Sequence, residues 1–544
     1  MKHMKMILAA VMVVGMGRML VLYTTNPPVP MSPKDLWQEG GDLLYPPMGK
    51  KEDYAKAREI LEKVAAQEDD RVSAADALAD LAEIYKEGFG VGKDEARARH
   101  YFEQALSTYK ELIANAERNP KAAAFANFQL GHIYESHENS EGAEGQYAHW
   151  VKPDEERSRN YFEQARILFE QVVDQYDDLE SVAEANIALG HLYEVGHLGD
   201  ADWDKAQIYY DRVAHNKQIP LKLSIDAYFA LAQMYEYGEG AYDLGQDIEK
   251  SMNYYNRIIS LAQQAGRLES AYRARMGIGD IYVHGVGQDG PDFIKAQAEY
   301  QKIGQLANAQ QGIAYLYRYG QGDTFPKDIK RAETYYRSAI ANQNASEEQK
   351  KLAREDLAGM FSELGSQYYQ INIDYALARQ YFNKVLEIEG ARSWNERMAH
   401  DALGKMSYEG QGGPKDYAEA RDHFNKVIAD KEASNWDKVT AQAYMGRIYY
   451  DERNYIEAAI LSQRALGVAN GPLKEQAIAQ YTLGMMYYFG RGLPVDRNIA
   501  KDYFALVVDN DYADAAEKLS AQEMLEAIEI MQNPNLMNRG LQAR

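Results

Sequence analysis

A pattern of apolar, small and aromatic residues recurs ten times along this chain and constrains its fold more than any other feature. In each copy a helical stretch ends at an anchor residue, usually followed by glycine. A second helical stretch then begins with Asp and a Lys or Arg. One pair of helices cannot bury its own apolar face, so successive pairs must stack as a helical solenoid. The anchor residues are Tyr85, Tyr134, Tyr193, Tyr235, Tyr282, Tyr317, Phe361, Ser407, Tyr449 and Tyr487.

A small residue also recurs at one position of the first helical stretch. Glycine inside a helix costs about 1 kcal/mol relative to alanine, so its recurrence in register needs a structural reason. We predict that a neighbouring helix approaches closely at this position. The residues are Gly131, Ala232, Gly279, Ala314, Gly404, Gly446 and Gly484.

One copy shows the whole pattern. It runs from Ala309 to Gly322, continues through Asp328–Ala332, where Asp328 can cap the second helix, and ends at the aromatic pair Tyr335 and Tyr336. This copy resembles the Sel1-like repeat, a subtype of the tetratricopeptide repeat. The resemblance implies an all-α fold, a right-handed α-solenoid superhelix of about ten helix pairs. It also implies a scaffold or adaptor rather than an enzyme.

Two copies depart from this pattern. The aromatic anchor is missing at Ser407, and the glycine loop is missing after Tyr449, where the turn is typical of an ordinary tetratricopeptide repeat. The resemblance still covers the chain from about Asp53 to about Ala516. We expect either one continuous superhelix or two sub-arrays.

The chain is strongly acidic and contains no cysteine. Its 544 residues carry a net charge of −22 at pH 7. This charge repels phosphate groups, so we expect neither nucleic acid nor an anionic membrane surface as a partner. The absence of cysteine excludes disulfides and thiolate metal sites. We expect other proteins as partners, a polysaccharide as a second class, and no cofactor.

The N-terminus is typical of an export signal. Lys2, His3 and Lys5 precede an apolar stretch at residues 6–17, which Arg18 interrupts. Cleavage and retention as a membrane anchor both fit this stretch, as does a helix buried within the protein. Positive charge before an export signal leaves the bulk of the chain outside the cytoplasm. We therefore expect an exported protein, either periplasmic or anchored in a membrane.

The segments around the solenoid predict its boundaries. Prolines at residues 24–51 favour a tether, either extended or lying as a strap along the first repeat, with a short helix over Lys34–Leu44. A last helix should cover the exposed face of the last repeat. The expected organisation is a signal peptide or signal anchor at 1–23, the Pro-rich tether at 24–51, the solenoid at 52–516, a capping helix at 517–533 and a disordered tail at 534–544.

The long insertion at residues 135–153 is a candidate partner-binding loop. It carries Tyr147, His149 and Trp150 outside the repeat pattern. An exposed Trp is a common energetic centre of protein interfaces. The alternative is that Trp150 docks back on the helix expected at 154–176.

Two histidines occupy the same position in successive first helices. His132 and His191 could approach each other when the repeats stack, and His137 and His197 follow them. No third ligand with metal-binding spacing is evident. We therefore predict histidines on a partner-binding surface and no metal site.

The sequence contains no motif that supports catalysis. Residues 285–290 match the residue pattern of a dinucleotide-binding loop, but the sequence before them predicts a helix where that loop requires a strand. No paired-acid motif supports a glycan-acting enzyme. We predict a non-catalytic scaffold whose concave surface binds proteins, in the assembly of a bacterial cell-envelope, surface or secretion complex. An intracellular adaptor or a translocated effector is the alternative.

Overall fold

The computed structural model describes residues 31–46, 50–135, 150–237, 248–285, 290–391, 393–468 and 471–532. All regular secondary structure in these ranges is helical, apart from isolated bridges at Gln321. The chain divides into two compact units. Unit 1 comprises residues 1–327 and 343–347, and unit 2 comprises residues 328–342 and 348–544. The predicted all-α solenoid is confirmed within the described residues, where consecutive helices pack in pairs.

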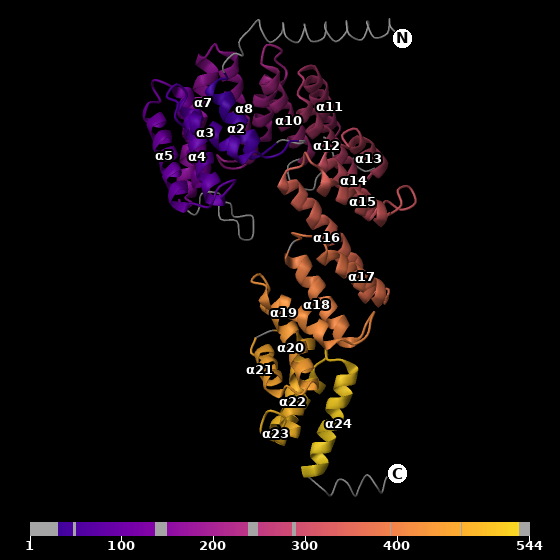
Figure 1. The fold of residues 1–544 in the computed structure, drawn as a ribbon. Helices are drawn as coiled ribbons and strands as arrows, with labels where there is room; N and C mark the ends of the chain where they lie inside the picture. The colour runs from indigo at the N-terminus through magenta and orange to yellow at the C-terminus, as the bar shows by residue number, and fades with distance from the viewer. Residues whose placement is uncertain are drawn as a thin grey trace, which may run out of the picture. The chain divides into compact units, whose positions relative to one another are not determined.

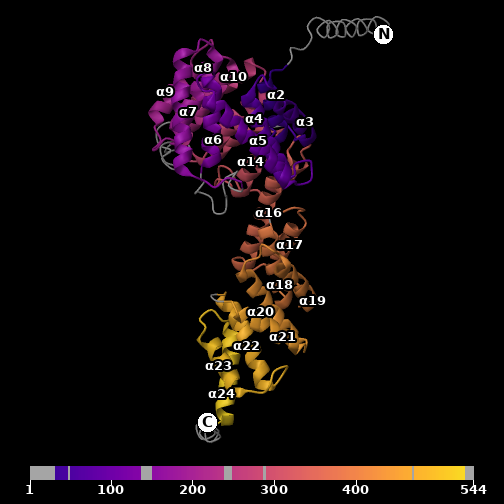
Figure 2. The ribbon, with the colours of Figure 1, turned by 90° about the vertical axis from the view of Figure 1, so that its left-hand side faces the viewer.

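Unit 1 is a stack of helix pairs followed by one further helix (Figures 1 and 2). Each helix contacts the next, and several first helices of neighbouring pairs also contact one another. The helices are α2 (Pro33–Leu44), α3 (Tyr54–Ala65), α4 (Arg71–Glu87), α5 (Glu95–Ala114), α6 (Pro120–Tyr134), α7 (Glu155–Gln175), α8 (Leu179–Val195), α9 (Trp203–Ala214), α10 (Leu221–Tyr237), α11 (Ile248–Gln264), α12 (Leu268–His284), α13 (Phe293–Gln301) and α14 (Ala307–Tyr319).

Unit 2 repeats the same arrangement and ends on an unpaired helix. The ten predicted anchor residues lie one on each even-numbered helix from α4 through α22. The helices of unit 2 are α15 (Ile329–Ala341), α16 (Glu347–Gln370), α17 (Tyr375–Leu386), α18 (Ser393–Glu409), α19 (Tyr417–Ala429), α20 (Asn435–Asp451), α21 (Tyr455–Leu466), α22 (Leu473–Phe489), α23 (Arg497–Asp509) and α24 (Ala515–Gln532).

The recurring glycine lies against an aromatic ring from the second helix of its own pair. A Cβ atom on Gly279 would lie 2.3 Å from the ring of Tyr300, and one on Gly131 would lie 2.4 Å from the ring of Phe162. These distances are far below van der Waals contact, so the ring occupies the space that any side chain would need. The predicted close approach is confirmed. The same relation holds for Gly190, Gly365, Gly404 and Gly484, whereas Gly446 faces Ser462.

The second helix holds the anchor ring from two sides. Tyr101 stacks on Tyr85 with ring centroids 5.6 Å apart, and the Arg97 guanidinium lies 4.8 Å from the Tyr85 centroid. Asp94 caps this helix and donates its backbone N–H to the Tyr85 carbonyl at 2.8 Å. The recurring Asp and Lys or Arg therefore fix the pair through a cap and a cation–π contact. Equivalent ring pairs are Tyr134–Tyr161, Tyr193–Tyr209, Tyr235–Tyr254 and Tyr487–Tyr503.

The anchor predicted at Phe361 is wrong, because Tyr368 occupies that position in α16. Tyr368 stacks on Tyr381 at 5.6 Å, and its carbonyl accepts the backbone N–H of the capping Asp374. Phe361 is fully buried seven residues earlier. Seven residues are about two helical turns, so both side chains face the same way. The sequence pattern therefore matched this 24-residue helix two turns too early.

The Pro-rich segment is not an extended tether throughout. Ser32 caps α2 and Pro33 begins it, at a position where the missing N–H costs nothing. The predicted short helix is confirmed. Leu44 is almost fully buried and packs with Ile60 and Leu61 of α3. The packed array therefore starts before the predicted boundary at residue 52.

The C-terminal helix covers the last repeat, close to where the sequence predicts it. Ala521 and Ile528 of α24 are fully buried in a cluster shared with α22 and α23. The predicted tail at 534–544 and signal segment at 1–23 lie outside the described residues. Among the helices that the structure describes, none has both the length and the apolar character needed to cross a membrane.

Candidate functional site

First helices of four successive pairs line a groove in unit 1. Side chains of α4, α6, α8 and α10 face a cavity of about 850 Å³, and α2 forms part of its wall. This volume lies within the range of ligand-binding pockets. The lining mixes apolar residues with charges of both signs, including Phe125, Phe128, Ile187, Lys34, Lys121, Lys222, Glu184 and Asp226.

Glu184 of α8 is the charged centre of the groove wall. Its side chain is only 8 % exposed. Lys121 of α6 lies 3.0 Å from one carboxylate oxygen, and Lys34 of α2 pairs with the other. Burial lowers the pKa of Lys34, and the neighbouring Lys121 lowers it further. This buried ion-pair network connects three helices that are distant in sequence.

Two further polar contacts hold α2 across the groove. The indole N–H of Trp37 donates to Asp80 on α4 at 2.8 Å, and Lys222 on α10 donates to Gln38. Burial raises the pKa of Asp80 to about 7, against the opposing effect of the Trp37 hydrogen bond. Because of these contacts α2 lies beside α4, α8 and α10 in both views (Figures 1 and 2). For the Pro-rich segment the sequence left open an extended tether or a strap along the first repeat. In the described part of this segment, α2 lies against the repeats as a strap would.

Of the two alternatives for Trp150, exposure and docking, the structure shows a docked side chain, although on a different helix from the one expected. Its ring centroid lies 4.9 Å from that of Phe102, and its indole N–H donates to Glu95 at 2.6 Å. Trp150 therefore docks on α5 rather than on the helix that follows it. Tyr147 and His149 lie outside the described residues, so the partner-binding role of this loop stays a prediction.

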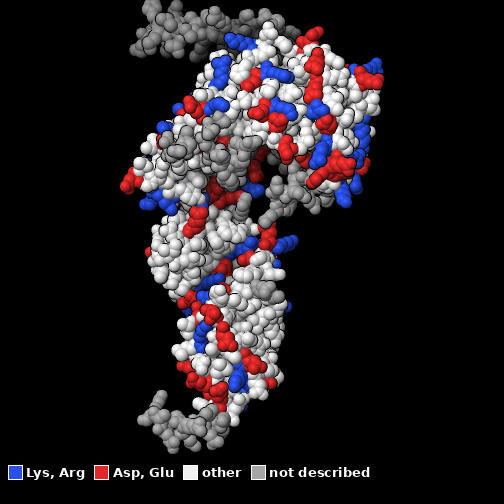
Figure 3. All heavy atoms as spheres, turned by 180° about the vertical axis from the view of Figure 1, so that it is seen from behind, with Lys and Arg blue, Asp and Glu red and all other residues white. Residues whose placement is uncertain are grey.

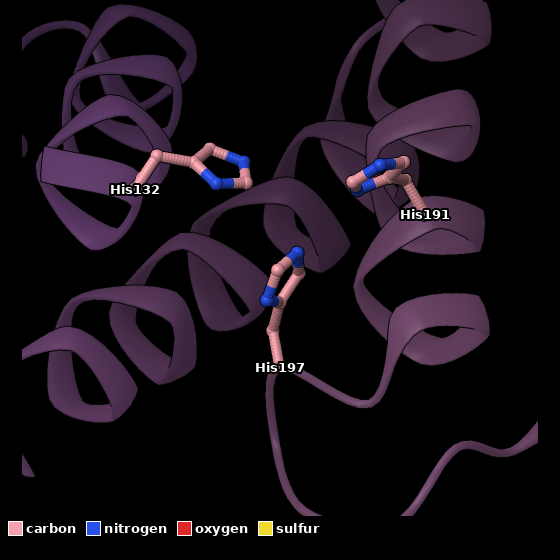
Figure 4. A group of neighbouring side chains, drawn as sticks. All are labelled: His132, His191 and His197. Atoms are coloured by element: carbon pink, nitrogen blue, oxygen red, sulfur yellow. The ribbon is translucent and has the colours of Figure 1, made fainter. Parts of the chain in front are cut away.

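Three histidines converge at the edge of the groove (Figure 4). His132 of α6 and His191 of α8 line the groove, and His197 lies in the turn after α8. Each ring offers one nitrogen, and these atoms all lie within 4.8 Å of one another. The predicted approach of His132 and His191 is confirmed. The spacing in the sequence does not reveal a third neighbour, but the structure brings the His197 ring within the same distance.

Gly196 brings His197 back towards the helices. Its φ of 78° is left-handed, and a Cβ there would lie 2.7 Å from the Gly199 carbonyl oxygen. Only glycine adopts this turn without strain. The sequence feature that indicates this turn is a helix-capping glycine directly before a histidine. The spacing of the histidines along the sequence does not show that the turn directs His197 towards the other two rings.

The cluster has unusual electrostatics. Burial lowers the pKa of His191 to about 4, and the neighbouring His197 and His132 add to this shift. Burial opposes ionisation of Glu135, but hydrogen bonds from His132 and His197 outweigh it and hold the pKa of that carboxyl well below its usual range. At neutral pH the cluster therefore combines a neutral His191 ring with an ionised carboxylate.

Charges of both signs are interspersed over the face shown in Figure 3. The groove likewise combines lysines with carboxylates. The net charge of −22 therefore does not produce one uniform field on this face. Mixed charge favours recognition of a complementary pattern over general attraction to one sign.

Comparisons with known proteins give family-level information. A model of the Sel1 repeat matches residues 41–69, 75–107, 124–166, 183–216, 225–262, 307–344, 397–427 and 477–509, together just over half of the chain. A crystal structure of a Sel1 repeat protein from Oxalobacter formigenes has 20% sequence identity and a TM-score of 0.33, covering 65% of this chain and 90% of that chain. A crystal structure of an engineered protein has 14% identity and a TM-score of 0.21, covering 87% and 98%. No curated protein matches the chain.

Proposed function

Because this chain belongs to the Sel1 repeat family, whose repeats build protein-interaction scaffolds, we propose that it is a non-catalytic scaffold that binds polypeptide segments in the groove of unit 1. The observation that carries this proposal is the groove itself, a cavity of about 850 Å³ lined by α2 and by first helices of four successive pairs. A surface shared by several repeats suits an extended chain, since each repeat can contact a different part of it.

The lining supports a partner of mixed character. Phe125 and Ile187 offer apolar surface, and Lys121, Glu184 and Asp226 stand among them. A peptide with apolar side chains flanked by charges can bury the former and pair the latter. A polysaccharide, the second partner class that the composition allows, would use the aromatic rings and polar groups instead.

We place this scaffold in the bacterial cell envelope, in the assembly of a surface or secretion complex. The support is the basic and then apolar pattern at residues 2–17. An intracellular adaptor or translocated effector would carry out the same binding in another compartment. Location and binding therefore need separate experiments.

Site-specific photo-crosslinking tests the groove. We expect a photoreactive phenylalanine analogue at Phe125, in the groove, to crosslink the full-length protein to a defined partner in cells. The matched control places the analogue at Glu103, an exposed position on α5. Crosslinking of that partner at both positions, or at neither, would contradict the groove as the binding surface. Loss of the crosslinked mass on treatment with polysaccharide-degrading enzymes would identify a glycan partner.

Fractionation of the same cells tests the location. We expect the protein and its crosslinked product in the envelope or periplasmic fraction. Recovery in the cytosolic fraction alone would contradict the envelope role and support the intracellular adaptor. It would leave the groove result unaffected.

A further inference from the structure

The histidine cluster has a composition that scaffolding does not require. We propose that His132, His191 and His197 bind one divalent transition-metal ion, with zinc as the reference ion. Glu135 orients two of these rings without binding the metal itself. The site lies where α6 and α8 meet, beside the groove (Figure 4).

Glu135 determines which ring nitrogens are available. One carboxylate oxygen accepts from Nδ1–H of His197 at 2.8 Å, and the other accepts from Nδ1–H of His132 at 3.1 Å. An ionised carboxylate can only accept, so the proton of each ring lies on Nδ1 and the lone pair on Nε2. Carboxylates support metal-binding histidines in this way, because they fix the tautomer and the ring orientation.

Two ring nitrogens in the cluster are buried without a hydrogen-bond partner among the described residues. They are Nδ1 of His191 and Nε2 of His197. The His197 side chain is only 4% exposed. A buried polar atom without a partner costs free energy. A metal ion between the rings would bond to both lone pairs and remove this cost.

The three ligand nitrogens could bind one metal ion if they moved slightly closer together. The candidate ligand atoms lie within 4.8 Å of one another. Tetrahedral zinc, with metal–nitrogen bonds of about 2.0–2.1 Å, needs its ligands roughly 3.4 Å apart. Rotations about the histidine side-chain torsions can supply this difference, since the three rings already point towards one another (Figure 4).

An aromatic shell surrounds the cluster. Phe162 stacks on His197 with ring centroids 4.2 Å apart, and the ring of Phe128 lies 4.7 Å from that of His132. Such a shell limits the access of water to the site. It also gives a local role to Phe162, the ring that occupies the space beside Gly131.

The ligand chemistry selects the class of ion. Imidazole nitrogens suit zinc, copper, nickel and iron, whereas calcium and magnesium require oxygen ligands. Three protein ligands leave one position of a four-coordinate ion open. Water or a side chain of a bound partner can fill it, because His132 and His191 also line the groove.

Titration of the untagged full-length protein with Zn²⁺ and Co²⁺, after treatment with a chelator, tests the site. We expect one saturable equivalent, with visible Co²⁺ bands that Zn²⁺ abolishes and Ca²⁺ leaves unchanged. His191→Gln and His197→Gln should abolish binding at this site. Glu135→Gln should weaken binding ten- to a hundredfold, as expected for a residue that supports the ligands.

His400→Gln in unit 2 is the matched control. Nδ1 of His400 lies 2.9 Å from Nδ1 of His423, so the substitution changes a partly buried histidine outside the proposed site. This variant should bind zinc like the wild type. The proposal is overturned if the wild type shows no saturable binding, if His191→Gln and His197→Gln bind normally, or if His400→Gln loses binding equally. If the histidine variants lose helicity by circular dichroism, Glu135→Gln decides, and an unchanged affinity in that variant overturns the proposal. No partner protein is needed, so the result is independent of the scaffold function.

Discussion

At the scale of single residues, six helix pairs share a contact between a glycine of the first helix and a buried ring of the second. Tyr300 is 1% exposed and packs directly against Gly279. Its hydroxyl donates to Asp280 at 2.5 Å, which fixes the ring along its long axis. Burial raises the pKa of Tyr300 and the charge of Asp280 raises it further, so the hydroxyl keeps its proton. The ring therefore has little freedom to move away from an added side chain.

Gly279→Ala should destabilise the region around α12 by up to about 2 kcal/mol. An overpacked core costs about 1–3 kcal/mol, and the better helix propensity of alanine returns at most about 1 kcal/mol. Amide hydrogen exchange of α12 and α13 measures the change. The control is Gly41→Ala in α2, where an added Cβ meets nothing within 4 Å. That variant should be neutral or more stable. Equal effects at both positions would contradict the role of the ring contact.

At the scale of elements, α2 combines apolar packing against α3 with polar contacts to three other helices. Trp37 bonds to Asp80, Gln38 to Lys222, and Lys34 to Glu184. Their partners lie on α4, α10 and α8. Docking of α2 therefore depends on several first helices having the correct spacing. Because Trp37 bonds to Asp80, the docking of α2 also depends on the charge of the Asp80 carboxyl group.

Docking of α2 should weaken as pH rises through about 7. The pKa of Asp80 is raised to about 7, mainly by burial; the Trp37 hydrogen bond lowers it, and the charges of Asp76 and Glu83 contribute to the rise. The docked state therefore holds this proton more tightly than a state with Asp80 in water. The stabilising contribution is complete below the ordinary pKa of about 4 and is lost as pH rises through 7. Amide exchange at residues 33–44, corrected for the intrinsic rate, should show faster opening at pH 8 than at pH 6.

Asp80→Asn is the control for this pH effect. The amide cannot ionise, yet its oxygen can still accept the indole N–H of Trp37. The variant should show the same α2 opening at both pH values. A pH dependence like that of the wild type would show that another group titrates.

At the scale of the whole molecule, each unit has its own apolar cores. The buried clusters around Tyr210 and Phe102 lie in unit 1, and those around Phe424 and Phe504 lie in unit 2. In a repeat protein stability is approximately a sum over repeats and their interfaces with neighbours. Two units with separate clusters can therefore unfold separately.

We expect two calorimetric unfolding transitions for the full-length protein. Gly279→Ala should lower the midpoint of one, and Gly404→Ala in unit 2 should lower the midpoint of the other. A Cβ at Gly404 would lie 2.7 Å from the ring of Phe424, so the two substitutions are matched in kind. A single transition that both variants shift equally would show that the units unfold as one.

The local features of each repeat could be predicted from the sequence. The glycine register and the capping Asp depend on residues within one helix pair. The sequence pattern does not identify Tyr368 as an anchor, because Phe361 lies two turns earlier on the same face of a long helix and fits the pattern as well. The family model leaves three pairs unmatched: α16/α17, which holds this long helix, α20/α21, which has the turn without the glycine loop, and α12/α13.

The amino-acid pattern alone establishes the helix pairs, their aromatic and glycine contacts and the repeat family, because neighbouring residues make those contacts. The groove, the docking of α2 and the histidine cluster depend on the folded chain. Lys34 meets Glu184, and His132 meets His197 across the boundary between two repeats. Such distant pairs depend on how each repeat is rotated against the next. Because the packing of whole helix faces determines this rotation, it cannot be predicted from any short stretch of sequence.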